Sequence, residues 1–288
     1  MNLCDYNSIR ALLGRHGFHF SKSMGQNFLI DPQVPYDIAA SSQADKTCAV
    51  LEIGPGIGPL TAELAQRAAK VVSIELDKSL LTVLAETMAE YPNVEIVPGD
   101  AMKMDLNALV AEKFDGLTPI VCANLPYNIT TPILEKFVEA ACFQSITVLI
   151  QKEVAKRLCA PQGSSDGGSF SLFLQYYMET EYLFEVPADK FLPPPKVTSA
   201  VMRCVRRAKP AVEVEDEAFF FKVMRGAFLL RRKKMVNSLV SALPGFSKER
   251  IQSAIEECGL SPTVRGEQLT LQDFANLSKV LAEKRHIS

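Results

Sequence analysis

The stretch Leu51-Glu52-Ile53-Gly54-Pro55-Gly56-Ile57-Gly58 decides how this sequence folds. It ends an apolar run that begins at Cys48, and residues 59–67 after it have helical spacing. An apolar run bounded by turn residues predicts a buried strand. Glycines at the corner after a strand adopt dihedral angles that other residues resist, and they let a ligand approach the backbone. The sequence therefore predicts a strand, a ligand-binding turn and a helix over residues 48–67.

The glycine loop does not fit a dinucleotide-binding site. That site needs the pattern Gly-x-Gly-x-x-Gly, and counting from Gly54 the third glycine position falls on Pro59. The loop instead resembles the Glu-x-Gly-x-Gly-x-Gly pattern of methyltransferases that use S-adenosylmethionine.

Strands and helices alternate from residue 48 onward. We expect further strands at 71–75, 94–98, 120–123 and 145–151, and helices at 79–91 and 131–142. Alternation at this spacing predicts a parallel sheet with helices on both faces. Residues 181–186 and 199–205 predict two last strands, antiparallel at the sheet edge. The fold class is therefore α/β: a Rossmann-like, mostly parallel sheet with an antiparallel edge strand.

The two ends of the chain predict helices without strands. Short helices are expected at 6–16 and 33–42, and from about residue 214 the pattern is helical only: 215–230, 231–242, 247–258 and 271–284. A composition shift near 206–213, with Pro210 in the linker, predicts a domain boundary there. We expect a catalytic domain over residues 1–207 and a smaller all-α domain over residues 208–288.

Composition excludes several classes of protein. Hydrophobic residues make up 48% of the 288, yet no apolar stretch approaches the length that spans a bilayer. The seven cysteines include no Cys-x-x-Cys pair, which favours reduced thiols in a cytosol and argues against a zinc site. With only three histidines, His16, His19 and His286, we expect no metal centre.

Charge divides unevenly along the chain. Residues 1–205 hold 16 basic and 23 acidic residues, whereas residues 206–288 hold 15 and 10. The net charges are thus −7 and +5, which favours an acidic catalytic domain and a basic module that meets phosphates. A solvated helical face would give a milder version of the same asymmetry.

The loop Asn124-Leu125-Pro126-Tyr127 carries the second chemical signal. It follows the apolar run 119–123, so it should lie beyond the carboxyl end of a strand, where ligands collect in α/β sheets. An amide oxygen and a backbone carbonyl can both accept hydrogen bonds from one exocyclic amine, and a tyrosine face can stack on the base. The loop resembles the Asn-Pro-Pro-Tyr loops that methylate amino groups of bases. The alternative is an ordinary strand-to-loop turn.

Two neighbouring strands should end in carboxylates. Glu75 is placed to accept hydrogen bonds from both ribose hydroxyls of a cofactor, and Asp100 from its adenine amine. Either residue alone is more often a helix cap. Glycines, Glu and Asp at three successive strand ends favour a cofactor site.

These motifs occur together in one family. Lys22–Leu29, Leu51–Gly58, Gly99–Ala101, Asn124–Tyr127 and Phe191–Ser199 appear in the order seen in ribosomal RNA adenine N6,N6-dimethyltransferases. The chain resembles the bacterial small-subunit (16S) type over nearly its whole length, including the helical C-terminal part. A sequence pI of about 6.0 favours this type over the more basic large-subunit (23S) type that confers macrolide resistance.

The resemblance implies roles for particular residues. S-adenosylmethionine would be bound by Asn27, Leu29, Gly54, Gly56, Glu75, Asp100, Ala101 and Asn124, with residues 1–30 forming an N-terminal helix and a cofactor-contacting segment. The catalytic set would be Asn124, the Pro126 carbonyl, Tyr127 stacked on the target adenine, and Phe191 on its other face. Arg231, Arg232, Lys233 and Lys234 would bind RNA. Two alternatives stay open: Phe191 as a core residue, and residues 231–234 as an exposed helical face.

The resemblance also implies the reaction and its partners. It predicts dimethylation of two adjacent adenosines near the 3′ end of 16S rRNA, within the 30S subunit or its precursor. We expect a monomer that acts in the cytoplasm, with a role in subunit biogenesis and no membrane partner. The alternatives are a 23S rRNA methyltransferase and a non-catalytic RNA-binding assembly factor on the same fold.

Overall fold

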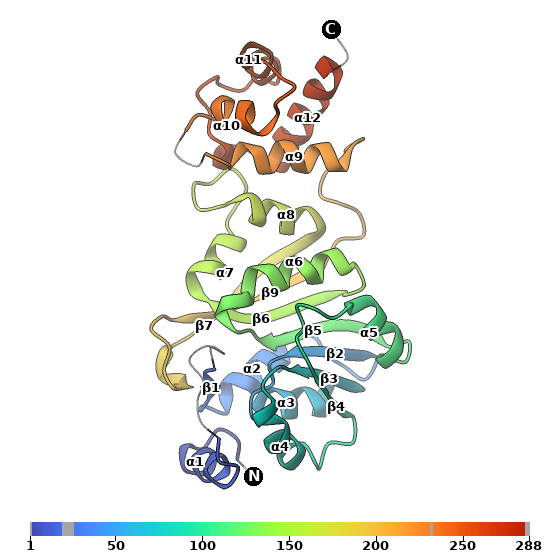
Figure 1. The fold of residues 1–288 in the computed structure, drawn as a ribbon, viewed down its shortest axis with the longest axis vertical. Helices are drawn as coiled ribbons and strands as arrows, with labels where there is room; N and C mark the ends of the chain where they lie inside the picture. Colours follow the sequence, from blue (N-terminus) through green and yellow to red (C-terminus); the bar gives the residue numbers. More distant parts are fainter. Residues whose placement is uncertain (1, 19–25, 231–232, 286–288) are drawn as a thin grey trace. The chain divides into compact units, whose positions relative to one another are not determined.

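The computed structural model describes residues 2–18, 26–230 and 233–285. The chain forms two compact units (Figure 1): unit 1 comprises Met1–Ala155 and Glu181–Arg206, and unit 2 comprises Lys156–Thr180 and Arg207–Ser288. Relative to the expected division at residue 207, Lys156–Thr180 groups with the C-terminal part. None of the described helices is long and apolar enough to cross a membrane.

A seven-stranded sheet is the framework of the described fold. Its strands are β2 (Cys48–Ile53), β3 (Lys70–Glu75), β4 (Val94–Pro98), β5 (Thr118–Asn124), β6 (Ser145–Gln151), β7 (Met178–Val186) and β9 (Ser199–Arg206). They lie in the order β4-β3-β2-β5-β6-β9-β7. The first five are parallel, and β9 is antiparallel to β6. The expected mostly parallel sheet with an antiparallel strand toward one edge is confirmed.

The direction of β9 matters for the site. Because β9 runs against β6, its first residue, Ser199, pairs with Gln151, the last residue of β6. The start of β9 therefore lies at the same sheet edge as the carboxyl ends of the parallel strands.

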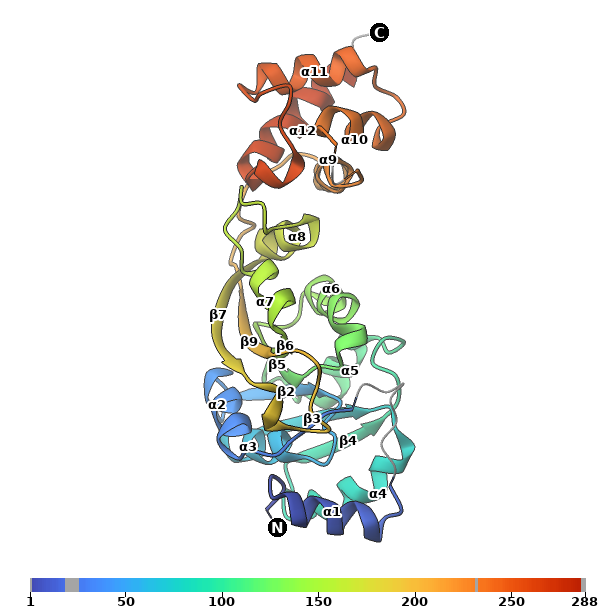
Figure 2. The same cartoon turned by 90° about the vertical axis from the view of Figure 1, so that its left-hand side faces the viewer.

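Helices cover both faces of the sheet (Figure 2). On one side lie α2 (Gln33–Ser41), α3 (Pro59–Arg67) and α4 (Lys78–Thr87). On the other lie α5 (Leu106–Lys113) and α6 (Thr130–Ala140). Strand β2 is buried at all six positions, as expected for a strand covered on both faces. Helix α5 was not expected from the sequence.

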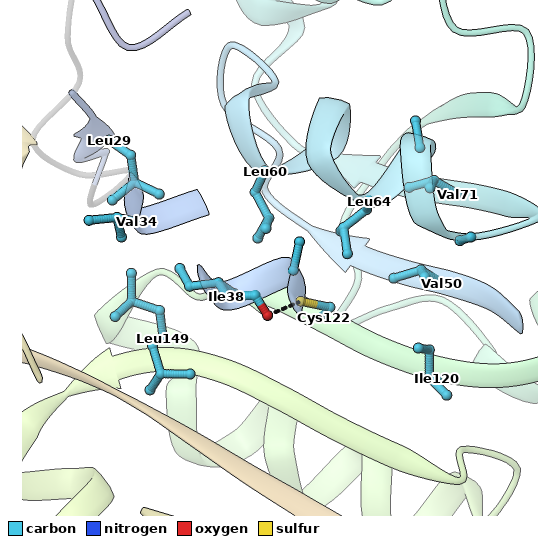
Figure 3. Packing of buried hydrophobic residues seen from close by; sticks show 14 of the residues in the cluster. Leu29, Val34, Ile38, Val50, Leu60, Leu64, Val71, Ile120, Cys122 and Leu149 are labelled. Atoms are coloured by element: carbon cyan, nitrogen blue, oxygen red, sulfur yellow. Dashed lines mark hydrogen bonds between the residues drawn. The ribbon is translucent and has the colours of Figure 1, made fainter. Parts of the chain in front are cut away.

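The main core of unit 1 lies between α2, α3 and the sheet (Figure 3). Ile38 from α2 and Leu60 and Leu64 from α3 belong to one buried cluster with Val50 and Ile120 of the strands. Each of these side chains is at most 4% exposed, so each contributes about 1.5–3 kcal/mol through burial. This packing holds the glycine corner after β2 against the start of α3.

The N-terminal segment joins unit 1 in two places. Helix α1 (Tyr6–Arg15) packs Ile9, Leu12 and Leu13 against α4. Strand β1 (Phe28–Leu29) then pairs antiparallel with β8 (Phe191–Leu192) in a separate two-stranded sheet. Neither short strand was expected from the sequence.

Among its described residues, unit 2 has helices and loops and, apart from the start of β7, no strand. Its elements are α8 (Ser169–Tyr177), α9 (Glu217–Ala227), α10 (Met235–Ala242), α11 (Lys248–Glu257), α12 (Leu271–Arg285) and most of α7 (Lys152–Leu158). Aromatic rings of Phe173, Tyr176, Phe220 and Phe221 pack α8 against α9, with neighbouring centroids 5.0–5.4 Å apart. The helix expected from residue 231 begins at Met235, so Lys233 and Lys234 lie in the turn before it.

Candidate active site

A cavity of about 180 Å³ lies at the carboxyl edge of the parallel strands. Five stretches of unit 1 line it: residues 26–29, 52–60, 74–80, 99–101 and 124–129. The structure thus brings together the glycine corner, the two carboxylate strand ends and the Asn124 loop. Every predicted cofactor-binding residue lines this cavity: Asn27, Leu29, Gly54, Gly56, Glu75, Asp100, Ala101 and Asn124.

All three glycines of the corner have left-handed dihedrals, and at two of them a Cβ would also crowd a neighbouring side chain. Gly56 has φ +62°, and a Cβ there would lie 3.1 Å from two ring carbons of Phe28. Gly58 has φ +95° and caps the N-terminus of α3, which begins at Pro59. Left-handed dihedrals cost an L-residue roughly 1–2 kcal/mol. The ring of Phe28 occupies the space that a side chain at Gly56 would need.

Glu75 ends β3 with its carboxylate at the cavity. The side chain is 6% exposed, and the backbone N–H of Asp77 donates to it over 2.8 Å. Burial raises the pKa of Glu75 to about 7, although N–H groups of Asp77, Gly56 and Leu76 offset part of that effect. The carboxyl group is thus poised between its two protonation states near neutrality.

Glu52 lies just before the glycines and is 1% exposed. Its Oε2 accepts hydrogen bonds from the hydroxyls of Thr61 and Ser73, each over 2.7 Å. These bonds tie the end of β2 to helix α3 and to strand β3. Burial raises the pKa of Glu52 to about 7. The sequence motif contained Glu52, but the sequence alone gave it no partner.

The charge of the cavity discriminates between ligands. Four carboxylic acids line it, Glu52, Glu75, Asp77 and Asp100, and the described lining includes no Lys, Arg or His. Phosphate groups are repelled by carboxylates and are usually paired with cations, so this lining opposes a dinucleotide although a glycine-rich helix start is present. It suits a ligand with positive charge and ribose hydroxyls. The lining residues therefore fit S-adenosylmethionine, which carries a sulfonium and an ammonium group.

The Asn124 side chain is oriented by the N-terminal segment. Its Nδ2 donates to the Asn27 carbonyl over 3.4 Å. With the amide nitrogen committed to that carbonyl, the amide oxygen is the acceptor that Asn124 brings to the cavity lining.

The Pro126 carbonyl already has donors inside its own loop. It accepts hydrogen bonds from the Ile129 N–H at 3.2 Å and the Thr130 hydroxyl at 3.3 Å. A carbonyl has two lone pairs, so both are in use here. The adjacent Leu125 carbonyl receives no hydrogen bond from the described residues, and Leu125 lines the cavity. The acceptor role expected for Pro126 stays a prediction.

The two aromatic residues predicted to stack on the target base lie in different environments. Tyr127 lines the cavity and is half-buried. Phe191 is 2% exposed, belongs to the main core with Leu29, and is not among the described lining residues. Its pairing with Leu29 in the β1–β8 sheet explains this burial. The structure therefore describes Phe191 as a core residue, and its stacking role stays a prediction.

Of the four basic residues proposed to bind RNA, Arg231 and Arg232 lie outside the described residues. Lys233 and Lys234 are exposed in the turn between α9 and α10, and Lys234 is the N-cap residue of α10. A helical face, the alternative interpretation, does not describe these two lysines.

Comparison with known proteins decides the family. Residues 17–283 match the family described as ribosomal RNA adenine dimethylase. The chain belongs to this family. It is 45% identical to ribosomal RNA small subunit methyltransferase A of Geobacillus sp. (strain WCH70), covering 94% of this chain and 95% of that protein. It is 46% identical to the protein of the same name from Streptococcus sanguinis (strain SK36), covering 98% of both.

Solved structures show the same fold. The crystal structure of 23S rRNA methyltransferase ErmE is similar with a TM-score of 0.69 and 27% identity, over 89% of this chain and all of that one. A dimethyladenosine transferase from Plasmodium falciparum gives a TM-score of 0.74 at 23% identity, over 89% and 98%. The expected Rossmann-like methyltransferase fold is confirmed, and the chain is an rRNA-modifying methyltransferase that uses S-adenosylmethionine.

Proposed function

We propose that this member of the ribosomal RNA adenine dimethylase family dimethylates N6 of two adjacent adenosines near the 3′ end of 16S rRNA. The relatives that share about 45% of its residues over nearly the full length are named small subunit methyltransferases. The 23S rRNA methyltransferase is less similar, at 27% identity. The substrate would be the 30S subunit or its precursor. The enzyme would act on it as a monomer in the cytoplasm.

The cavity residues have distinct roles in this proposal. Glu75 would accept hydrogen bonds from the ribose hydroxyls of the cofactor, and Asp100 from its adenine amine. Asn27 and Leu29 would lie at its amino-acid end, with Gly54, Gly56 and Ala101 against its other parts. The cofactor supplies an activated methyl group on a cationic sulfur, and the carboxylate-rich lining matches that charge.

The Asn124 loop would make the adenine amine reactive. The lone pair of N6 is delocalised into the ring, so the amine is a poor nucleophile until it becomes pyramidal. Hydrogen bonds from N6 to the Asn124 amide oxygen and to a loop carbonyl favour that geometry. We assign the second acceptor to the Leu125 carbonyl, because the Pro126 carbonyl already accepts two bonds. Acceleration then comes from positioning and electrostatic fit.

Tyr127 would hold the target base after it leaves its stack in the RNA. Extrusion of a base costs a few kcal/mol, and stacking on an aromatic ring returns about 1–3 kcal/mol. In unit 2, Lys233 and Lys234 would contact phosphate together with Arg231 and Arg232. Two lysines at the positive end of α10 are unfavourable on their own, and an RNA phosphate would offset this.

The observation that carries the proposal is the cavity itself: its described lining has four carboxylic acids and no Lys, Arg or His, and it adjoins an asparagine whose amide nitrogen is already hydrogen-bonded. The test is transfer of labelled methyl groups to unmethylated 30S subunits, with 50S subunits in parallel, followed by nucleoside analysis. N6,N6-dimethyladenosine from 30S subunits alone supports the proposal. Label in 23S rRNA alone would make the chain a large-subunit enzyme, and no label with intact cofactor binding would favour an assembly factor.

A further inference from the structure

The hydroxyl of Tyr127 is bonded to a residue far away in the sequence. Tyr127 Oη lies 2.6 Å from the Oγ of Ser199, 72 residues later. Ser199 is 0% exposed, so it cannot contact an RNA base itself. Burial raises the pKa of the Tyr127 phenol, which keeps the hydroxyl protonated and able to share this hydrogen bond.

The sheet fixes the position of Ser199. It pairs with Gln151 at the end of β6, and the neighbouring Thr198 carbonyl accepts a hydrogen bond from the Lys152 N–H over 3.0 Å. Only the antiparallel direction of β9 brings this strand start to the edge where the Asn124 loop emerges. The serine is therefore a rigid point beside a loop whose own turn, Tyr127–Ile129, is only three residues long.

A tyrosine ring on a short turn can rotate about two side-chain bonds. The hydrogen bond at Oη restricts the Cα–Cβ rotation directly. It restricts the Cβ–Cγ rotation because a phenolic O–H and its hydrogen-bond partner prefer to lie in the ring plane, so the ring has less freedom to lose when a base stacks on it. Pre-organisation of this kind lowers the free energy of binding the extruded base without adding a contact to it.

We propose that Ser199 is a positioning residue that sets the ring plane of Tyr127 for the target adenine. This inference rests on the proposed function, because it assumes that Tyr127 stacks on the base. The proposed role of Ser199 concerns the binding of the target base and not the binding of the cofactor. Ser199 is not among the described residues that line the cofactor cavity, so the affinity for S-adenosylmethionine should not depend on it.

The experiment is a double-mutant cycle with Ser199→Ala, Tyr127→Phe and the double variant, assayed for methyl transfer to unmethylated 30S subunits. Each single variant should lower kcat/KM for the subunit by roughly fivefold, the usual effect of one neutral hydrogen bond. The double variant should be no worse than either single variant, and Ser199→Thr should restore activity. In the two Ser199 single variants the Kd of S-adenosylmethionine should stay within about twofold, because Ser199 is not among the described lining residues.

A control variant separates positioning from a general loss of stability. Thr147→Val removes another buried hydroxyl from the same sheet, and this hydroxyl has no partner among the described residues. It should leave kcat/KM unchanged. In protein with ¹³C-labelled tyrosine, the Tyr127 ring signals should also show greater mobility in Ser199→Ala.

Four results would count against the inference. Full activity of Ser199→Ala, or additive losses in the double variant, would show that the hydrogen bond does not position the ring. Wild-type protein that methylates no subunit would overturn the proposed function, and this inference with it. Rigid Tyr127 signals in Ser199→Ala would count against the inference alone.

Discussion

At the scale of single residues, Asn124 is the clearest test of the reaction. Its amide nitrogen is bonded to Asn27, and its amide oxygen is the acceptor proposed for the target amine. Asn124→Ala should lower kcat by about 100-fold or more, the usual loss when one pre-organised group is removed. Binding to 30S subunits, measured by sedimentation, should persist. Equal loss of binding and transfer would contradict separate catalytic and docking surfaces.

Glu75 predicts a pH dependence of cofactor binding. Its raised pKa of about 7 means that the ionised acceptor is the minor form at pH 6 and the major form at pH 8. Affinity for S-adenosylmethionine, measured by calorimetry, should therefore increase about tenfold over this range. Glu75→Gln should bind more weakly and lose most of this dependence. If the variant keeps the full dependence, another group, such as Glu52, titrates instead.

Without cofactor, the raised pKa of Glu75 makes folding stability change with pH in the opposite direction to cofactor affinity. Between the usual carboxyl pKa near 4.5 and the folded value near 7, folded Glu75 binds a proton that the unfolded chain does not. The free energy of unfolding contributed by Glu75 therefore falls as pH rises through this window. Saturating cofactor should reduce that fall, because it favours the ionised form.

At the scale of elements, the glycine corner and β1 act together. Gly56→Ala places a methyl group 3.1 Å from the Phe28 ring in β1, in addition to a left-handed dihedral that costs about 1–2 kcal/mol. We expect β1 to shift and cofactor affinity to fall roughly tenfold or more.

The matched control is Gly116→Ala. Gly116 has φ +75°, but a Cβ there meets nothing within 4 Å. Both variants should lose the stability that a left-handed dihedral costs, measured as Tm, and Gly56→Ala should lose more because of the Phe28 contact; only Gly56→Ala should weaken cofactor binding. Equal cofactor affinities would show that the contact with Phe28 does not matter.

The sequence predicts elements whose pattern is local. Strand β2 and helix α3 follow from an apolar run, glycines and helical spacing, and their prediction was confirmed. The cavity residues at successive strand ends were predictable because carboxyl ends of parallel strands meet at one edge. Strands β1 and β8 have two residues each, too few to show a period, so their pairing was not predictable.

Side-chain partners distant in sequence were also beyond prediction. The burial of Phe191 follows from the β1–β8 pairing, and the bond between Tyr127 and Ser199 follows from the strand order. Likewise, the hydroxyls that hold Glu52 come from two other elements. Each depends on the assembled sheet rather than on a local pattern.

At the scale of the whole molecule, charge divides between the two units. Unit 1 holds 15 basic and 21 acidic residues, and unit 2 holds 16 and 12, so the net charges are −6 and +4. The acidic unit contains the cavity for a cationic cofactor, and the basic unit carries the exposed Lys233 and Lys234. Added salt should therefore weaken the binding of 30S ribosomal subunits much more than it weakens the binding of the cofactor.

Replacing both lysines tests this division. The slope of log Kd for 30S subunits against log salt concentration should fall by about 0.7–0.9 for each phosphate contact removed. In the double variant Lys233→Gln with Lys234→Gln the slope should therefore fall by roughly 1.5. The control variant Lys279→Gln removes one exposed positive charge from α12 of the same unit and should leave the slope unchanged. Equal slopes for all the variants would mean that the turn before α10 does not contact phosphate. A slope reduced equally by Lys279→Gln would mean that net charge, rather than this turn, governs docking.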